Sequence, residues 1–194
     1  MSFNGSQAFL WLRKQRSIVA LHNAIKSANK DATPLEISTN GLIDLGVKLS
    51  AFNLKLNGYT LENIFQSSKV FSNGGPYLDL LDVSPKEAKR DDRLHNSGAL
   101  LGFNYAGIDF PLEPKTVFYD YIYINAVKQT LLPEEIVKIK DYTHFTDIEF
   151  NPQRSINTQA KSVAIIRLML ELYNEIPSFD VSDFIRFHTE VVKC

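Results

Sequence analysis

The chain has 194 residues, with 44% hydrophobic and 22% charged side chains, which is typical of one globular domain. Its net charge of −1 is unlike that of proteins that hold duplex DNA through many phosphates, although it is compatible with a local basic pocket for one modified nucleotide. The sequence has no apolar run of about 18 residues and no secretory leader, so we expect a cytoplasmic protein without a membrane span.

Hydrophobic periodicity and turn residues predict a mainly helical chain. Helices are expected at residues 7–29, 42–48, 61–71, 84–90, 114–129, 133–142, 156–176 and 180–192. Strands are expected at 35–38, 50–56, 100–105 and 108–110, with a further strand and loop within 144–157. The pattern has no internal repeat and no low-complexity linker. It therefore predicts a single α+β domain over residues 1–194, mainly helical around a small β-sheet.

Two of these helices have clear start signals. Thr60 follows an expected turn at Asn57-Gly58 and is a suitable N-cap for the helix at 61–71. Ser84 is followed by Pro85 and Glu87, which places a capping serine and a proline at the start of the next helix.

The helix expected at 61–71 carries reactive groups along one face. Glu62, Phe65, Gln66 and Lys69 follow spacings of three and four residues, which share a helix face. A carboxylate, an amide and an amine beside an aromatic ring form a candidate reactive site. The same spacing is typical of a solvated face with Phe65 in the core, and periodicity alone leaves both interpretations open.

Several blocks of the sequence resemble the NADAR family, which includes YbiA-like N-glycosidases. They are LSAFN, YTLENIFQSSKVF, NGGPYLDLL, SPKEAKR, PLEPKTVFYDYIYINAV and FTDIEFNPQRSINTQAKS, which follow one another in the family's order between about Leu35 and Leu172. The blocks are most similar to the branch of DarT-associated NADAR antitoxins. The basic N-terminal helix matches more weakly.

This resemblance implies a hydrolase that cleaves an N-glycosidic bond without a cofactor or metal. Its substrate would be ADP-ribosylated guanine in single-stranded DNA or RNA, and its product ADP-ribose. Such an ADP-ribosyl glycosidase would reverse a DarT-type toxin, either as an antitoxin or as a phage counter-defence protein, and the toxin itself would be a further partner.

Two alternative functions are also compatible with the sequence. One is an N-glycosidase that acts on a small riboflavin-pathway metabolite. Many YbiA-like relatives carry a tryptophan-glycine pair near Asp147, and its absence here speaks against this substrate. The other is a non-catalytic antitoxin that binds the toxin directly, with an exposed aromatic helix at 117–127 as its interface.

The resemblance implies three catalytic candidates. Cleavage at ribose C1 builds positive charge on the sugar, so a carboxylate stabilises the transition state and a proton donor helps the base to leave. Glu62 matches the glutamate that opens the family's helical motif, although a first-turn acid also simply stabilises a helix dipole. Lys69 matches the lysine that ends the motif, either as a neutral amine that attacks C1 or as a fixed cation. Asp147 is the second acid, unless it is an ordinary turn residue.

The resemblance also implies a set of substrate-binding residues. Amide and basic groups suit a pyrophosphate, and aromatic rings suit a base. The candidates are Lys14, Arg16, Ser50, Phe52, Asn53, Gln66, Tyr77, Lys89, Arg90, Arg154 and Asn157. Taken singly, each basic residue is equally compatible with a solvated surface position.

Overall fold

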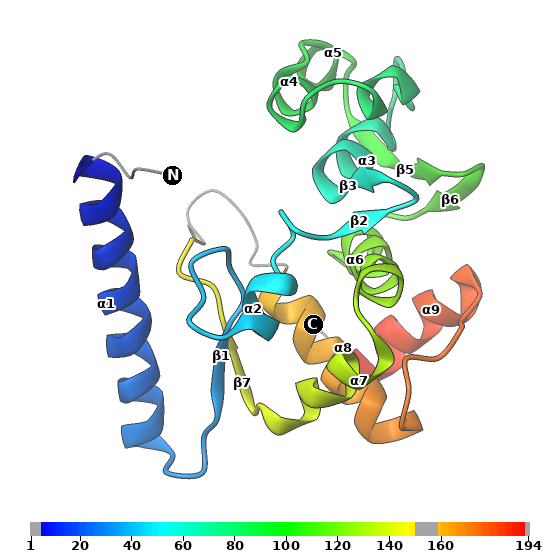
Figure 1. Ribbon diagram of the computed structural model, residues 1–194. Coiled ribbons are helices and arrows are strands. Elements are labelled where there is room, and N and C mark those ends of the chain that lie inside the picture. Colours follow the sequence, from blue (N-terminus) through cyan, green and yellow to red (C-terminus); the bar gives the residue numbers. More distant parts are fainter. Residues whose placement is uncertain (1–4, 150–158, 193–194) are drawn as a thin grey trace. The chain divides into compact units, whose positions relative to one another are not determined.

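The computed structural model describes residues 5–149 and 159–192 and confirms the mainly helical α+β class (Figure 1). The α-helices are α1 (Gly5–Ala28), α2 (Asp44–Lys48), α3 (Leu61–Ser67), α4 (Pro85–Arg90), α5 (Arg93–Asn96), α6 (Val117–Thr130), α7 (Pro133–Val137), α8 (Gln159–Tyr173) and α9 (Val181–Phe187). Two 3₁₀ helices, η1 (Leu78–Leu81) and η2 (Lys138–Asp141), and a π-helical turn, η3 (His188–Val192), complete the helical part. The strands are β1 (Pro34–Glu36), β2 (Lys55–Leu56), β3 (Tyr59–Thr60), β4 (Lys69–Phe71), β5 (Leu100–Tyr105), β6 (Ile108–Phe110) and β7 (His144–Thr146).

The chain packs into two compact units. Unit 1 comprises Met1–Asn53 and Leu131–Ile176, and unit 2 comprises Leu54–Thr130 and Pro177–Cys194. The expectation of one domain over residues 1–194 stays a prediction. Within the described ranges, none of the helices combines the length and apolar character that crossing a bilayer requires.

Unit 1 is built on a parallel strand pair. Strand β1 pairs with β7 in the register Pro34↔His144 to Glu36↔Thr146, and all three residues of β1 are buried (Figure 1). Ile18 of α1 and Ile166 of α8 are also fully buried in this unit. The strand expected at 35–38 is thereby confirmed to within two residues. Residues 150–157 of the expected strand-and-loop block lie outside the described residues.

Unit 2 contains an antiparallel sheet in the order β4-β5-β6. The hairpin expected between β5 and β6 is confirmed, and its turn is formed by Ala106 and Gly107, both with positive φ. Helix α6 packs against these strands through Phe118, whose ring centroid lies 4.5 Å from that of Phe103 and 5.0 Å from that of Phe110. Aromatic burial of this kind contributes much of the core energy of a small unit.

The strand expected at 50–56 is wrong for most of its length. Only Lys55–Leu56 pairs, with Tyr59–Thr60, across the expected turn at Asn57-Gly58, where both residues have positive φ. Residues 50–53 form a turn instead, in which the Asn53 amide donates to the Ser50 carbonyl at 2.8 Å. This local hydrogen bond satisfies backbone groups that a strand would have paired with a neighbour.

The two predicted caps are confirmed. The Thr60 hydroxyl accepts a hydrogen bond from the Asn63 amide at 3.2 Å and starts α3. Ser84 and Glu87 form a reciprocal capping box, in which the Ser84 amide donates to Glu87 Oε2 at 2.9 Å. Both caps involve residues three positions apart, so the local sequence contains the whole signal.

Helix α3 ends earlier than the sequence predicts. The expected helix at 61–71 stops at Ser67, and Lys69–Phe71 becomes strand β4. Lys69 of β4 pairs with Phe103 of β5, a residue that lies more than 30 positions further along the chain. Tertiary pairing therefore overrides the helical periodicity of this segment.

Helix α6 is not the exposed aromatic surface that the sequence suggested. Between residues 117 and 127, every side chain is buried or half-buried. Phe118 and Tyr123, for example, are 1% and 0% exposed. The interface expected at 117–127 is therefore wrong, because these aromatic rings form the core of unit 2.

A buried polar pair fixes the C-terminal part of unit 2. The Asp120 carboxylate of α6 is fully buried and accepts hydrogen bonds from Thr116 Oγ1 and His188 Nε2, each at 2.8 Å. His188 begins η3 and is also buried. A carboxylate in such a place is tolerated only when its oxygens are satisfied.

We expect Asp120→Ala to lower the free energy of unfolding by about 3 kcal/mol, because it removes the acceptor for the buried His188 and the half-buried Thr116. The measurement is urea unfolding of the purified chain. Asp183→Ala is the matched control, because Asp183 pairs with Arg186 on the surface at 2.7 Å; it should cost less than about 1 kcal/mol. Equal losses for the two variants would contradict the role of the buried pair.

Candidate active site

Three of the predicted residues form a hydrogen-bonded row in unit 2. Gln66 Nε2 donates to Glu62 Oε1 at 2.7 Å, and Lys69 Nζ donates to Gln66 Oε1 at 2.7 Å. Glu62 and Gln66 lie one turn apart on α3, whereas Lys69 is the first residue of β4. Gln66 is buried, and a buried amide needs partners for both its oxygen and its nitrogen. Lys69 and Glu62 supply these partners.

A glycine turn shapes the backbone beside Lys69. Gly75 has a φ of +85°, and a Cβ on it would lie 2.2 Å from the carbonyl oxygen of Lys69. The Tyr77 amide then donates to the Ser67 carbonyl at 2.8 Å and holds the turn against the end of α3. Glycine is therefore required at position 75 for the chain to close over Lys69.

The Lys69 amine lies in a partly apolar environment. Its Nζ is 5.2 Å from the ring centroid of Phe65, which packs against Phe103 at 5.1 Å and Tyr119 at 5.8 Å. Burial lowers the pKa of Lys69, the charge of Glu62 opposes this change, and the charge of Lys89 adds to it. At any given pH near neutrality, more of this amine is uncharged than in an exposed lysine.

Lys89 and Arg90 lie in the last turn of α4 and are exposed. Tyr77 is more constrained, because its hydroxyl is hydrogen-bonded to the Ser97 hydroxyl and the Arg93 guanidinium lies 4.5 Å from its ring centroid. The Tyr77 ring is therefore in contact with a cation, and the Phe71 ring centroid lies 6.4 Å from its own.

Sequence reasoning did not identify Arg93. Its guanidinium is held by Asp79 at 2.6 Å and by Asp91 at 2.8 Å, so it is fixed over Tyr77. Asp91 is two residues away in the sequence, but the approach of Asp79 and Tyr77 depends on tertiary structure. The local sequence therefore held no signal for this position.

A second set of predicted residues lies in unit 1, around Asp147. Asp147 Oδ2 accepts from Gln159 Nε2 at 2.5 Å, and Gln159 Oε1 accepts from the Ala51 amide at 3.0 Å. Gln159 thereby joins the segment after α2 to the segment after β7. Burial raises the pKa of Asp147, and the hydrogen bond from Gln159 partly offsets this rise. Ser50, which precedes Ala51 in the chain, is buried. Its hydroxyl has no hydrogen-bond partner in the described ranges.

Glu36 is a further buried carboxylate of unit 1 that sequence reasoning missed. It is 2% exposed and accepts from Thr146 Oγ1 at 2.5 Å and from the Ile148 amide at 2.8 Å. His22 Nε2 of α1 lies 3.0 Å from the same threonine hydroxyl. A charged residue between Leu35 and Ile37 in an expected strand was the available signal.

The basic residues predicted on α1 differ in their surroundings. Lys14 forms an ion pair with Glu149 at 2.7 Å, and the two side chains are 41% and 37% exposed. Glu149 also accepts from the Asn40 amide group at 2.9 Å. Arg16 is exposed. Lys14 is therefore partly neutralised within unit 1, and Arg16 faces solvent.

The remaining predicted residues lie in or beyond the turn that follows α2. Phe52 is 80% exposed, which suits a ring that stacks on a ligand. Asn53 is exposed, and its side chain donates to the Val47 carbonyl at 2.7 Å. Arg154 and Asn157 lie outside the described residues.

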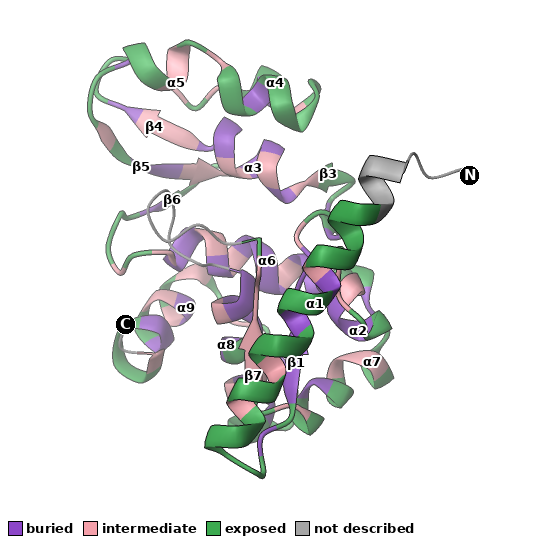
Figure 2. Cartoon of the chain, turned by 90° about the vertical axis from the view of Figure 1, so that its left-hand side faces the viewer, coloured by how far each residue is buried: buried purple, intermediate pink, exposed green. Residues whose placement is uncertain are grey.

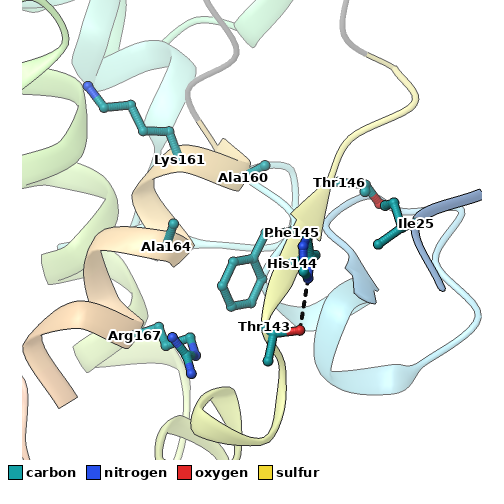
Figure 3. Close-up of a pocket in the computed structure, with 9 residues that line it drawn as sticks. All are labelled: Ile25, Thr143, His144, Phe145, Thr146, Ala160, Lys161, Ala164 and Arg167. Carbon is teal, nitrogen blue, oxygen red and sulfur yellow. Dashed lines mark hydrogen bonds between the residues drawn. The ribbon is translucent and has the colours of Figure 1, made fainter. Parts of the chain in front are cut away.

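Unit 1 also has an open pocket of about 500 Å³ (Figure 3). It is lined by Ile25, Thr143, His144, Phe145, Thr146, Ala160, Lys161, Ala164 and Arg167. Figure 3 shows the Phe145 ring directed toward α8, while the Thr143 hydroxyl bonds to His144 Nδ1 at 2.8 Å. Among the residues that the structure describes, none of the predicted catalytic or binding residues lines this pocket. The described residues also contain no group of three or more His, Cys, Asp and Glu side chains that could hold a metal ion.

The model of a family described as DarT1-associated NADAR antitoxin matches residues 1–192. No curated protein matches the chain.

We expect the pKa of Lys69 to lie below the usual lysine value of 10.5, because the amine is partly desolvated. Glu62→Gln should lower this pKa further, since it removes the charge that opposes the shift. Lys89→Ala should raise it, since it removes a repelling cation. An NMR titration of the Lys69 side chain measures all three values, and shifts of the same sign in the two variants would contradict this electrostatic account.

Proposed function

As a member of the family of DarT1-associated NADAR antitoxins, this chain has an antitoxin role, and we propose that it fills this role as an enzyme. The proposed reaction is the hydrolysis of the bond between ADP-ribose and a guanine base in single-stranded DNA or RNA. It would reverse the modification made by a DarT-type toxin and release ADP-ribose.

The observation that carries this proposal is the Glu62–Gln66–Lys69 row. It places a carboxylate and an amine of lowered pKa on the two ends of one buried amide. N-glycoside cleavage needs a carboxylate to stabilise the charge that develops on the sugar. A neutral amine is also a nucleophile, whereas a protonated one is not.

We assign the nucleophile to Lys69 and the charge-stabilising carboxylate to Glu62. Lys69 Nζ attacks ribose C1, the bond between C1 and the base nitrogen breaks, and the guanine leaves with a proton. Of the two protons on the attacking amine, one passes to the departing guanine and the other to the ring oxygen as the sugar ring opens to a Schiff base. Water hydrolyses this imine, which returns the free amine and releases ADP-ribose. Every atom comes from the substrate, Lys69 or water.

We propose separately, from its own environment in unit 1, that Asp147 can act as a proton donor. Burial raises its pKa, so its protonated form persists to higher pH than that of an exposed aspartate. The hydrogen bond from Gln159 at 2.5 Å fixes the orientation of the carboxyl group. A general acid of this kind typically contributes 10²–10⁴-fold to a rate, by an order-of-magnitude estimate.

We expect the wild-type chain to remove ADP-ribose from a modified guanine oligonucleotide, and Lys69→Ala to lose this activity by at least about 10²-fold. A gel shift of the adduct measures the rate. Lys55→Ala is the control, because Lys55 is an exposed lysine of the same unit; its rate should equal that of the wild type. If the wild-type chain leaves the adduct intact, the glycosidase proposal is wrong.

The role of Lys69 as a nucleophile has its own test. Lys69→Arg keeps a positive charge but forms no Schiff base, so it should be as inactive as Lys69→Ala. Borohydride added during turnover should trap a covalent adduct on the wild-type chain alone, detected as a mass increase. Activity in Lys69→Arg, or no trapped adduct, would assign Lys69 to a fixed cation instead.

A further inference from the structure

Helix α1 has a charge unlike that of the rest of the chain. Its 24 residues include four basic side chains and no acidic one. The whole chain has 21 basic and 22 acidic side chains, so 17 basic and 22 acidic ones remain outside α1. The net charge of −1 thus hides a helix of about +4 on an otherwise acidic protein.

One face of α1 is packed within unit 1. Ile18 and Gln15 are buried, and His22 reaches the hydroxyl of Thr146 in β7 at 3.0 Å. These positions are three, four and seven residues apart, so they share one side of the helix. Figure 2 shows this pattern as a mostly exposed helix with short buried stretches.

The opposite face of α1 carries a stripe of Phe9, Leu12, Arg13 and Arg16, at spacings of three, four and seven residues. Phe9 is 62% exposed and Leu12 is 48% exposed, and both arginines are exposed. We call these four residues the α1 stripe. Two guanidinium groups therefore share a solvent-facing surface with an aromatic ring.

The arginines of the α1 stripe have no acidic partner in the part of the chain that the structure describes. Lys14, on the side of the helix that faces unit 1, instead pairs with Glu149 at 2.7 Å. Opposite charges three or four residues apart would stabilise this helix, but its sequence contains no acidic residue to form such a pair. The charges of Arg13 and Arg16 are free for an external anion.

A membrane surface fits this arrangement less well than a nucleic acid strand does. Helices that lie on membranes separate a broad apolar face from a basic face. Here Arg13 and Arg16 lie next to Phe9 along the same line of the helix. An aromatic ring followed by two cations instead suits a single strand, which offers an unstacked base beside successive phosphates.

We propose that the α1 stripe binds single-stranded nucleic acid, with phosphates on Arg13 and Arg16 and a base stacked on Phe9. The inference rests on the proposed function only in one respect, namely that the bound strand is the unmodified part of the substrate next to the ADP-ribosylated guanine. Arg16, which the family resemblance placed among the ADP-ribose ligands, is thereby assigned to the strand.

The test is fluorescence anisotropy of the wild-type chain with a labelled, unmodified thymidine oligonucleotide at several salt concentrations. The double variant Arg13→Ala/Arg16→Ala should bind more weakly, and its slope of log affinity against log salt should fall by about 1.4, at roughly 0.7 for each lost phosphate contact. Phe9→Ala should weaken binding roughly 5- to 160-fold, as expected for one lost base stack, with little change in the slope.

The matched control is Lys138→Ala/Lys140→Ala in η2, which removes the same charge from exposed positions of the same unit. It should bind like the wild-type chain. An equal loss in both double variants, or wild-type affinity in Arg13→Ala/Arg16→Ala, would overturn the proposal. Binding to vesicles that contain phosphatidylserine is measured as well. If vesicle binding depends on the α1 stripe and strand binding does not, the stripe is assigned to a membrane instead.

This experiment also separates the two proposals. The unmodified oligonucleotide contains no bond to cleave, so its binding does not depend on glycosidase activity. Strand binding through α1 without cleavage of the modified oligonucleotide would leave the inference standing and remove the proposed function. Cleavage without α1-dependent strand binding would do the reverse.

Discussion

The hydrogen bond from the Lys69 amine to the Gln66 amide joins strand β4 to helix α3. A buried glutamine is stable only when both ends of its amide are satisfied, and here Glu62 and Lys69 satisfy them. Several other features of unit 2 serve this arrangement. Helix α3 must stop at Ser67 for Lys69 to enter the sheet, and Gly75 must lack a side chain for the next turn to close over the Lys69 carbonyl.

The same row determines the charge state of the amine. Phe65 and its aromatic neighbours remove water from one side of Lys69, which favours the neutral form. Glu62 favours the charged form and limits how far the pKa falls. The proposed reaction needs this balance, because the amine must be neutral to attack and the carboxylate must be charged to stabilise the sugar.

Unit 1 shows how a buried and a half-buried carboxylate, Glu36 and Asp147, are accommodated beside a parallel strand pair. Glu36 is satisfied by a threonine hydroxyl and a backbone amide, and Asp147 by a glutamine side chain and the Glu149 amide. Burial raises the pKa of Asp147, which favours its protonated, proton-donating form. The charge of α1 adds a feature that overall composition conceals, since a basic helix and an acidic remainder nearly cancel.

The sequence by itself determined the features that depend on a few neighbouring residues. The Thr60 cap, the Ser84 capping box and the Asn57-Gly58 turn involve partners within three or four positions, so they could be predicted, as could the α+β class. The reactive face of Glu62, Gln66 and Lys69 was visible for the same reason. Its alternative, a solvated helix face, could not be rejected from spacing alone.

The tertiary structure alone decided the features that depend on residues far apart in the chain. The pairing of Lys69 with Phe103 ended α3 four residues early and placed the amine against Phe65. Packing of α6 on the sheet buried the aromatic rings that the sequence had suggested as an interface. Arg93 over Tyr77 and Glu36 beneath Thr146 depend on residues 16 and 110 positions apart. Burial, and with it the pKa of an amine or a carboxylate, is a property of the folded surroundings and not of the local chain.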